Sequence, residues 1–186
     1  MTAKLKFVEA VPEADLLRLD LGCGKGANTP DGFVKVDKND HKDVQVVADL
    51  RGKWPWKSGS VDEVRANYVL HQLTMPERIH FLNELHRVLK VGGTAAIFTP
   101  HWCASRAYCD PDAQWPPVAE AFYPWTNKAW RDQQNVVNDL FKCNFDHTLG
   151  YGMHQHLMTR NHEYQSHAFT FWKEAAQDLI VTLTKI

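Results

Sequence analysis

The chain has 186 residues, of which 44% are hydrophobic and 23% are charged, and its formal net charge is −1 at pH 7. This composition is that of one globular domain with a sizeable core, and it excludes disordered and fibrous chains. The small net charge argues against a surface that tracks nucleic acid or anionic lipid, and no apolar run is long enough to span a membrane.

The N-terminal stretch and the cysteines bear on the compartment of the chain. The chain begins Met-Thr-Ala-Lys, without the apolar core of a secretory signal, and residues 4–9 are expected to form a short strand before the main sheet. The four cysteines include no close-spaced pair. Both features predict a reduced, cytoplasmic protein without a membrane segment.

The first strong strand signal is the apolar run 16–21, which ends in glycines at positions 22, 24 and 26. A short apolar run suits a buried strand of a parallel sheet. Gly22 and Gly24 permit a sharp turn and the close approach of a ligand. Asp20 brings a carboxylate to the carboxyl end of the strand, the edge at which open α/β sheets bind ligands.

Two further strands are predicted over 33–37 and 44–49, and each ends in an acid, Asp37 and Asp49. An acid after the second strand can accept both hydroxyls of a ribose. Only residues 25–32 separate the glycines from the second strand, and they contain a proline and a glycine. This connection is therefore predicted to be a loop or a single turn.

The next three elements follow a strand, helix, strand order. Residues 61–68 are predicted to hold a strand, and residues 76–90 a helix with apolar residues at helical spacing. Gly92 and Gly93 are expected to stop that helix. Residues 94–99 then form a fifth strand.

The tail of the chain gives weaker patterns. A helix is predicted over 126–141 with Thr126 as its N-cap, and strands are predicted over 145–153 and 179–186. The polar and aromatic stretch 154–172 gives no clear pattern.

Residues 101–125 form a long stretch without regular periodicity, rich in proline and aromatic side chains. Long irregular loops are often functional lids, and the aromatic content argues against disorder. Because the stretch follows the fifth strand, we expect an insertion at about 101–131 to cover an acceptor at the edge of the sheet. A small satellite core is the structural alternative for these aromatics. The candidate acceptor-binding residues are Trp102, Arg106, Tyr108, Trp115 and Arg131.

The order of these features resembles the class I S-adenosylmethionine-dependent methyltransferases. The resemblance extends from residue 16 to about residue 100, and the ordered set of motifs is more specific than any one of them. The sequence departs from the family where the first helix is shortened to a loop. The stretches that carry the resemblance are Asp20-Leu21-Gly22-Cys23-Gly24, Asp37, Ala48-Asp49-Leu50, 55–64, 67–73 and 85–93.

The resemblance implies a fold and a methyl donor. The fold is a Rossmann-like, doubly wound, mostly parallel seven-stranded sheet with an antiparallel terminal strand and helices on both faces, formed by residues 1–186 as one domain. The donor is S-adenosyl-L-methionine, with Asp20 on its methionine side, Asp37 on the ribose and Asp49 beside the adenine. The full set of implied donor-binding residues is Asp20, Gly22, Cys23, Gly24, Asp37, Lys38, Asp49, Leu50, Asn67 and Leu70.

Two histidines follow the fourth and fifth strands at the edge where the methyl group would lie. His71 and His101 are therefore candidates for a general base or an orienting group. The structural alternative is that each one supports its loop through a backbone hydrogen bond. His154 and His156 alternate in an extended segment, but no recognised metal-binding spacing is present and no metal is predicted.

Three functions remain open at this point. The first is methyl transfer to a small molecule, with an aromatic or largely apolar part expected from the aromatic insertion. The second is methylation of nucleic acid or protein, although residues 66–69 lack the base-methylating signature and the charge disfavours nucleic acid. The third is a donor-binding module without catalysis. The sequence does not define the oligomeric state.

Overall fold

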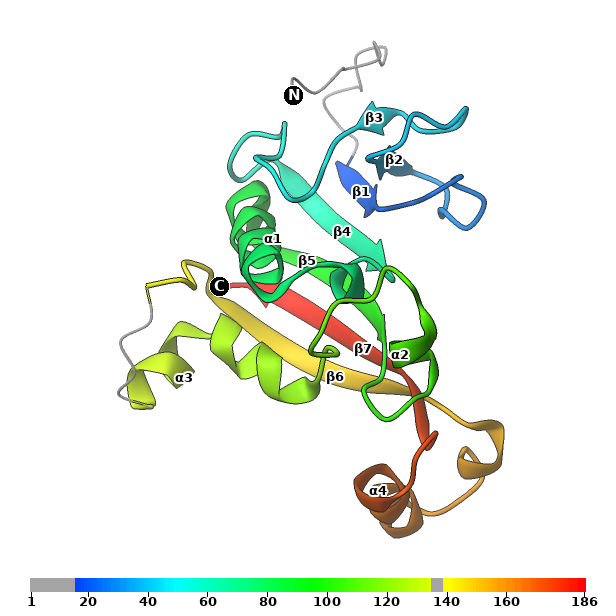
Figure 1. Ribbon diagram of the computed structural model, residues 1–186. Coiled ribbons are helices and arrows are strands. Elements are labelled where there is room, and N and C mark those ends of the chain that lie inside the picture. The colour runs from blue at the N-terminus through cyan, green and yellow to red at the C-terminus, as the bar shows by residue number, and fades with distance from the viewer. Residues whose placement is uncertain (1–15, 135–138) are drawn as a thin grey trace.

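The computed structural model describes residues 16–134 and 139–186, which form a seven-stranded sheet of order β3-β2-β1-β4-β5-β7-β6 (Figure 1). The strand predicted over 4–9 lies outside the described residues. β1 to β5 are mutually parallel, and β7 runs antiparallel between β5 and β6. The strands are β1 (Arg18–Leu21), β2 (Phe33–Asp37), β3 (Val46–Val47), β4 (Val61–Asn67), β5 (Leu89–Pro100), β6 (Phe145–Met153) and β7 (Ala176–Lys185).

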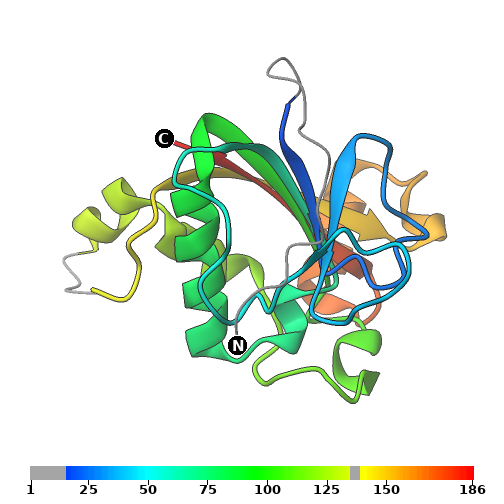
Figure 2. The same ribbon diagram turned by 90° about the horizontal axis from the view of Figure 1, so that it is seen from above.

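The helices are short apart from α1, which lies against one face of the curved sheet (Figure 2). The helices and 3-10 turns are η1 (Leu70–Gln72), α1 (Met75–Val88), α2 (Arg106–Cys109), η2 (Glu120–Thr126), α3 (Lys128–Gln133), η3 (Gln155–Leu157) and α4 (His162–Phe171). None of the helices in the described ranges is long and apolar enough to cross a membrane.

The parallel strands are buried, as their apolar runs predict. Leu19, Leu21, Val36, Val64 and Ala66 are all fully inaccessible to solvent in β1, β2 and β4. β1 pairs with both β2 and β4, so the carboxyl ends of these three strands meet at one edge. The predicted Rossmann-like sheet is confirmed, and its carboxyl edge collects the acids and glycines of the motifs.

The connections that join β1, β2, β3 and β4 along the chain are loops. Residues 25–32 form turns, as predicted, and β3 is reduced to Val46–Val47 from the expected 44–49. Between β1 and β4 no described residue is helical. The helical layers that accompany this fold are therefore thinner here than the resemblance implies.

The boundary between α1 and β5 differs from the prediction. The helix ends at Val88 and the strand begins at Leu89, so Gly92 and Gly93 lie inside β5 and do not stop the helix. The pairing with β4 shifts register at this point, and Gly92 has a φ of +78°. The glycines accommodate an irregularity of the strand.

The tail also needs correction. Among the described residues of the helix predicted over 126–141, those in α3, Lys128–Gln133, are α-helical, and residues 135–138 lie outside the described ranges. Thr126 belongs to η2 and does not cap α3. Asn127 caps it instead, because its side-chain oxygen accepts the Trp130 N–H at 3.0 Å. The stretch 154–172, for which no element was predicted, contains η3 and α4.

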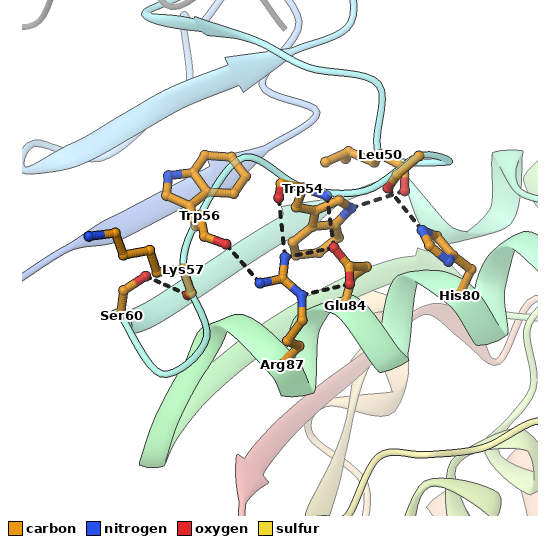
Figure 3. Close-up of polar contacts among 9 residues, drawn as sticks. Leu50, Trp54, Trp56, Lys57, Ser60, His80, Glu84 and Arg87 are labelled. Carbon is orange, nitrogen blue, oxygen red and sulfur yellow. Dashed lines mark hydrogen bonds and ion pairs between the residues drawn. The ribbon is translucent and has the colours of Figure 1, made fainter. Parts of the chain in front are cut away.

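α1 holds the loop after β3 through a network of hydrogen bonds (Figure 3). Glu84 accepts the Trp54 N–H at 2.8 Å, and Arg87 donates to the Trp54 and Trp56 carbonyls at 3.1 and 2.8 Å. The Trp54 indole N–H donates to the Leu50 carbonyl at 3.1 Å. The helix thereby positions the segment that follows β3 at the carboxyl edge.

Candidate active site

The glycine turn after β1 is built against β2 and β4. The N–H groups of Gly22 and Cys23 both donate to the Val36 carbonyl, at 2.8 and 3.0 Å. A Cβ on Gly22, whose φ is +71°, would lie 2.3 Å from Val69 Cγ2. A Cβ on Gly24 would meet nothing within 4 Å. Gly22 is therefore needed for packing, whereas Gly24 faces open space.

Asp37 joins this turn to the end of β2. Its Oδ2 accepts the Gly24 N–H at 2.9 Å and its Oδ1 accepts the Asn39 N–H at 2.8 Å, and the residue is 7% exposed. A carboxylate oxygen has two acceptor sites, so each oxygen can still accept one hydroxyl hydrogen. The arrangement fits the ribose of a nucleoside beside an open glycine backbone.

A cleft of about 370 Å³ lies at this edge, within the range of small-molecule and cofactor sites. The cleft brings together six of the sequence-predicted donor-binding residues. These are Gly22, Gly24, Asp37, Lys38, Asp49 and Leu50. Ala48, Tyr68, Val69, Gln72 and Leu73 also line the cleft and lie in the stretches that carry the resemblance, whereas the sequence did not indicate Asn39, Arg51 and Asp112.

Four predicted donor-binding residues do not line the cleft. Asp20 is buried and its Oδ2 accepts the Thr29 hydroxyl at 2.5 Å. Burial, together with the charges of Asp37 and Asp20, raises the pKa of Cys23 to about 11, so its thiol stays neutral. Leu70 is fully buried in the core, and Asn67 ends β4 with its Oδ1 buried and unpaired among the described residues.

Asp49 is paired with Arg51 at the far end of the cleft. The Arg51 side chain donates to Asp49 Oδ1 and Oδ2 at 2.9 and 2.7 Å. These hydrogen bonds lower the pKa of Asp49. The pair is about half exposed, so its contribution to stability is small, but it neutralises the carboxylate beside Leu50.

A second pocket, of about 370 Å³, adjoins the cleft. The two share Tyr68 and Gln72 in their walls. The second pocket, called here the edge pocket, is lined by Tyr68, His71, Gln72, Pro100, Arg106, Cys109 and Asp110.

Arg106 is engaged by protein groups at the rim of the edge pocket. It forms an ion pair with Asp178, and its guanidinium carbon lies 5.3 Å from the centre of the Tyr68 ring. The Tyr68 hydroxyl donates to Asp178 Oδ1 at 2.9 Å. The Arg106 charge is therefore balanced within the protein, and its proposed role is to hold Tyr68 in place.

His71 forms a pair with Asp110 inside the edge pocket. Its Nε2 lies 2.8 Å from Asp110 Oδ2, and the His71 side chain is 6% exposed against 30% for Asp110. The His71 Nδ1 is buried without a partner among the described residues. Since Nε2 lies beside the carboxylate, the Nε2–H donates, and Asp110 is the more exposed of the two residues.

His101 lines neither the cleft beside Asp37 nor the edge pocket. Its Nδ1 accepts the Cys103 N–H at 3.2 Å, so its Nε2–H donates to Glu120 at 2.6 Å. Glu120 also accepts the Trp102 indole N–H at 3.0 Å. His101 has both nitrogens engaged and orients Trp102 through Glu120.

The candidate acceptor residues separate in the structure. Trp102 and Tyr108 line a third pocket of about 370 Å³, the aromatic pocket, with Cys103 and residues 169–173. Trp115 is 78% exposed. Arg131 is not brought to the site, because it is buried and donates to the Trp125 and Cys143 carbonyls at 2.6 and 3.0 Å.

The insertion over 101–131 has two parts in the structure. Residues 101–115 lie beside the edge pocket and the aromatic pocket. Residues 118–131 pack against the sheet, with Tyr123 fully buried and Trp125 stacked on Phe141 at 6.3 Å. The aromatic residues of the second part therefore join the main core and do not form a separate satellite core.

His154 and His156 place their Nδ1 atoms 2.7 Å apart. Within the described ranges no group of three or more His, Cys, Asp or Glu side chains is arranged to hold a metal ion.

The pH dependence of stability offers a test of the Asp110 contacts. The Asp112 N–H and then the His71 hydrogen bond lower the pKa of Asp110 below its usual 3.8. Such a carboxylate stabilises the fold above its unfolded pKa, and this contribution is lost as the pH falls through the lower folded pKa. Between about pH 5 and pH 2, the melting temperature of Asp110→Asn should therefore fall less than that of the wild type. Asp132→Asn, which removes an exposed partner of Lys128, should lose melting temperature with falling pH as the wild type does. If Asp110→Asn loses as much as the wild type over the same pH range, the contacts of Asp110 do not stabilise the fold as described.

The comparisons with known proteins agree with this geometry. A family model described as "Methyltransferase domain" matches residues 19–97. No curated protein sequence matches the chain.

Three solved structures share the fold at low sequence identity. An S-adenosylmethionine-dependent methyltransferase from Archaeoglobus fulgidus has a TM-score of 0.65 at 16% identity and covers 92% of this chain and 87% of its own. The 1,6-didemethyltoxoflavin-N1-methyltransferase of Burkholderia thailandensis has a TM-score of 0.57 at 13% identity, and the match covers 92% of this chain and 71% of that one. Geranyl diphosphate C-methyltransferase from Streptomyces coelicolor A3(2) has a TM-score of 0.52 at 15% identity, and the match covers 92% of this chain and 73% of that one.

Residues 19–97 match the methyltransferase domain model, and the sheet topology is the Rossmann-like arrangement that the motifs predicted. The proposed function rests on this match and on the family and methyl donor that the motifs imply.

Proposed function

We propose that the protein transfers a methyl group from S-adenosylmethionine to a small molecule held in the edge pocket. The observation that carries this proposal is that the first cleft, called here the donor cleft, adjoins the edge pocket, because Tyr68 and Gln72 line both. A donor in the cleft and an acceptor in the pocket would therefore lie next to each other at the carboxyl edge of the sheet, which is the alignment that methyl transfer needs.

The donor would lie along the cleft with its ribose on Asp37 and its adenine between Leu50 and the Asp49–Arg51 pair. The open backbone at Gly24 would admit its methionine part. Bound S-adenosylmethionine supplies an electrophilic methyl group on a sulfonium. Asp20 does not line the cleft, so its role would be to hold the loop after the glycine turn by accepting the Thr29 hydroxyl.

The His71–Asp110 pair would serve the acceptor. Asp110 is the more exposed member and is placed to accept the hydrogen of an acceptor hydroxyl, thiol or amine. His71 would hold that carboxylate in position through its Nε2–H. As the methyl group leaves sulfur and bonds to the acceptor atom, the acceptor hydrogen would pass to Asp110.

The aromatic pocket supports an acceptor with an aromatic or apolar part. The pocket and the edge pocket lie on either side of α2, because Tyr108 lines the first and Arg106 and Cys109 line the second. Trp102 is fixed by Glu120, and the Tyr108 hydroxyl donates to the Trp102 carbonyl at 2.6 Å. Rigid aromatic walls of this kind bind flat, apolar groups.

Methyl transfer can be tested before the acceptor is identified. A metabolite extract incubated with the protein and a deuterated-methyl donor should yield a labelled small molecule, detected by mass spectrometry. Asp110→Asn should reduce the labelling about 10²- to 10⁴-fold, the usual contribution of a general base, with S-adenosylhomocysteine affinity retained. Comparable labelling of RNA or protein, or no labelling by a protein that binds donor, would overturn the proposal.

The aromatic pocket calls for a separate comparison. Trp102→Ala should raise the Michaelis constant for the labelled acceptor and leave S-adenosylhomocysteine affinity, measured by calorimetry, nearly unchanged. Trp115→Ala is the matched control, because Trp115 is highly exposed and lines none of the three pockets. Loss of donor binding by folded Trp102→Ala would show that this wall belongs to the donor site.

A further inference from the structure

Arg78 is a buried arginine on the first turn of α1. It is 1% exposed and donates to four backbone carbonyls. Its Nε contacts the Leu70 carbonyl at 3.0 Å and its Nη2 the His71 carbonyl at 3.5 Å, both in η1. Its Nη1 and Nη2 contact the Pro116 and Gln114 carbonyls at 2.6 and 3.0 Å.

The partners of Arg78 are unusual for a buried cation. A buried guanidinium normally has a carboxylate partner, because burying an unpaired charge is costly. Within residues 16–134 and 139–186 no carboxylate forms an ion pair with Arg78. Arg87 on the same helix is arranged differently, since it contacts two carbonyls but also pairs with Glu84 at 2.7 Å (Figure 3).

The carbonyls that Arg78 contacts belong to two of the segments that line the edge pocket. η1 supplies His71 and Gln72, and the loop 110–116 supplies Asp110. Apart from the His71–Asp110 pair, the direct backbone bond between these segments is the Gln114 N–H to the His71 carbonyl, at 2.8 Å. The loop has little regular structure of its own, so its position depends on such ties.

We propose that Arg78 is a positioning residue that sets the geometry of the His71–Asp110 pair by tying η1 to the loop 110–116. Arginine suits this role because its guanidinium carries five N–H donors in one rigid plane. Lysine has three donors on a single nitrogen and cannot reach carbonyls on both segments in the same arrangement. This inference rests on the proposed function, in which the pair faces the acceptor.

The test compares Arg78→Gln and Arg78→Lys with Arg87→Gln. In both Arg78 variants, hydrogen exchange of the amides in 110–116 should accelerate about tenfold or more, because the loop opens locally. The imidazole ¹⁵N signals of His71, assigned with His71→Asn, should shift. Donor-dependent labelling of the metabolite extract should fall about 10- to 100-fold, the effect of misplacing a reacting group by about 1 Å.

Arg87→Gln is the matched control. It removes an equally bonded arginine from the same helix and should lower the melting temperature, yet leave the His71 signals and the exchange of the loop 110–116 as in the wild type. If the Arg78 variants lose melting temperature but keep wild-type His71 signals and loop exchange, the residue is merely structural and the proposal is overturned. The exchange and ¹⁵N readouts need no acceptor, so they decide this inference even if the wild type labels nothing.

Discussion

Replacing Trp54 with alanine is expected to lower the free energy of unfolding by about 3–5 kcal/mol, the usual cost of truncating a fully buried tryptophan. Trp54 is 1% exposed, packs edge-on against Phe81 at 5.0 Å, and donates its indole N–H to the Leu50 carbonyl. The truncation would leave a cavity under the loop after β3 and an unpaired carbonyl on a residue that lines the donor cleft. In a domain of this size the melting temperature should fall by roughly 6–20 °C.

Trp56→Ala is the matched comparison for this change. Trp56 is half-buried and touches Trp54 at 6.2 Å between ring centres, so its truncation removes less buried surface. Chemical denaturation of both variants should give a clearly larger loss for Trp54→Ala. Equal losses would mean that the loop is held by backbone contacts with Glu84 and Arg87 rather than by the buried ring.

The sheet was predictable because its signals are local and ordered along the chain. Apolar runs ending in an acid or a glycine mark β1 and β2, and the short loop over 25–32 follows from its proline and glycine. The end of α1 was not predictable, since Leu89 continues the apolar spacing of the helix but pairs with Val61 of β4 instead. The predicted helix over 126–141 was too long, because Asn127 begins a shorter helix and Phe141 packs into the main core outside any helix.

The donor cleft was predictable where a residue follows a strand directly, as Asp37 and Gly24 do. Gln72 and Asp112 carry no such signal. Gln72 is placed by the 3-10 turn η1, and Asp112 by a loop that returns to η1 through the Gln114 N–H. Arg131 illustrates the reverse error. Its place in the aromatic insertion suggested an acceptor contact, but tertiary packing uses its guanidinium to satisfy backbone carbonyls.

The donor cleft depends most on Asp37. In Asp37→Ala the Gly24 and Asn39 N–H groups lose their acceptor, and because both lie at the open cleft, where water can replace it, each lost hydrogen bond should cost about 0.5–1.5 kcal/mol of stability. The proposed ribose contact is lost as well, so binding of S-adenosylhomocysteine should weaken by a further ~1–3 kcal/mol. Calorimetry with S-adenosylhomocysteine and thermal denaturation measure the two effects separately.

Asp37→Asn separates the charge from the shape. Asparagine retains one acceptor oxygen but turns an NH₂ donor toward the second N–H, so we expect it to be nearly as damaging as alanine for donor binding and less so for folding. Asp31→Ala removes an exposed acid from the neighbouring loop and should change neither measurement. If Asp37→Ala stays folded and binds S-adenosylhomocysteine with wild-type affinity, Asp37 stabilises the glycine turn without contacting the ribose, and the proposed orientation of the donor in the cleft is wrong.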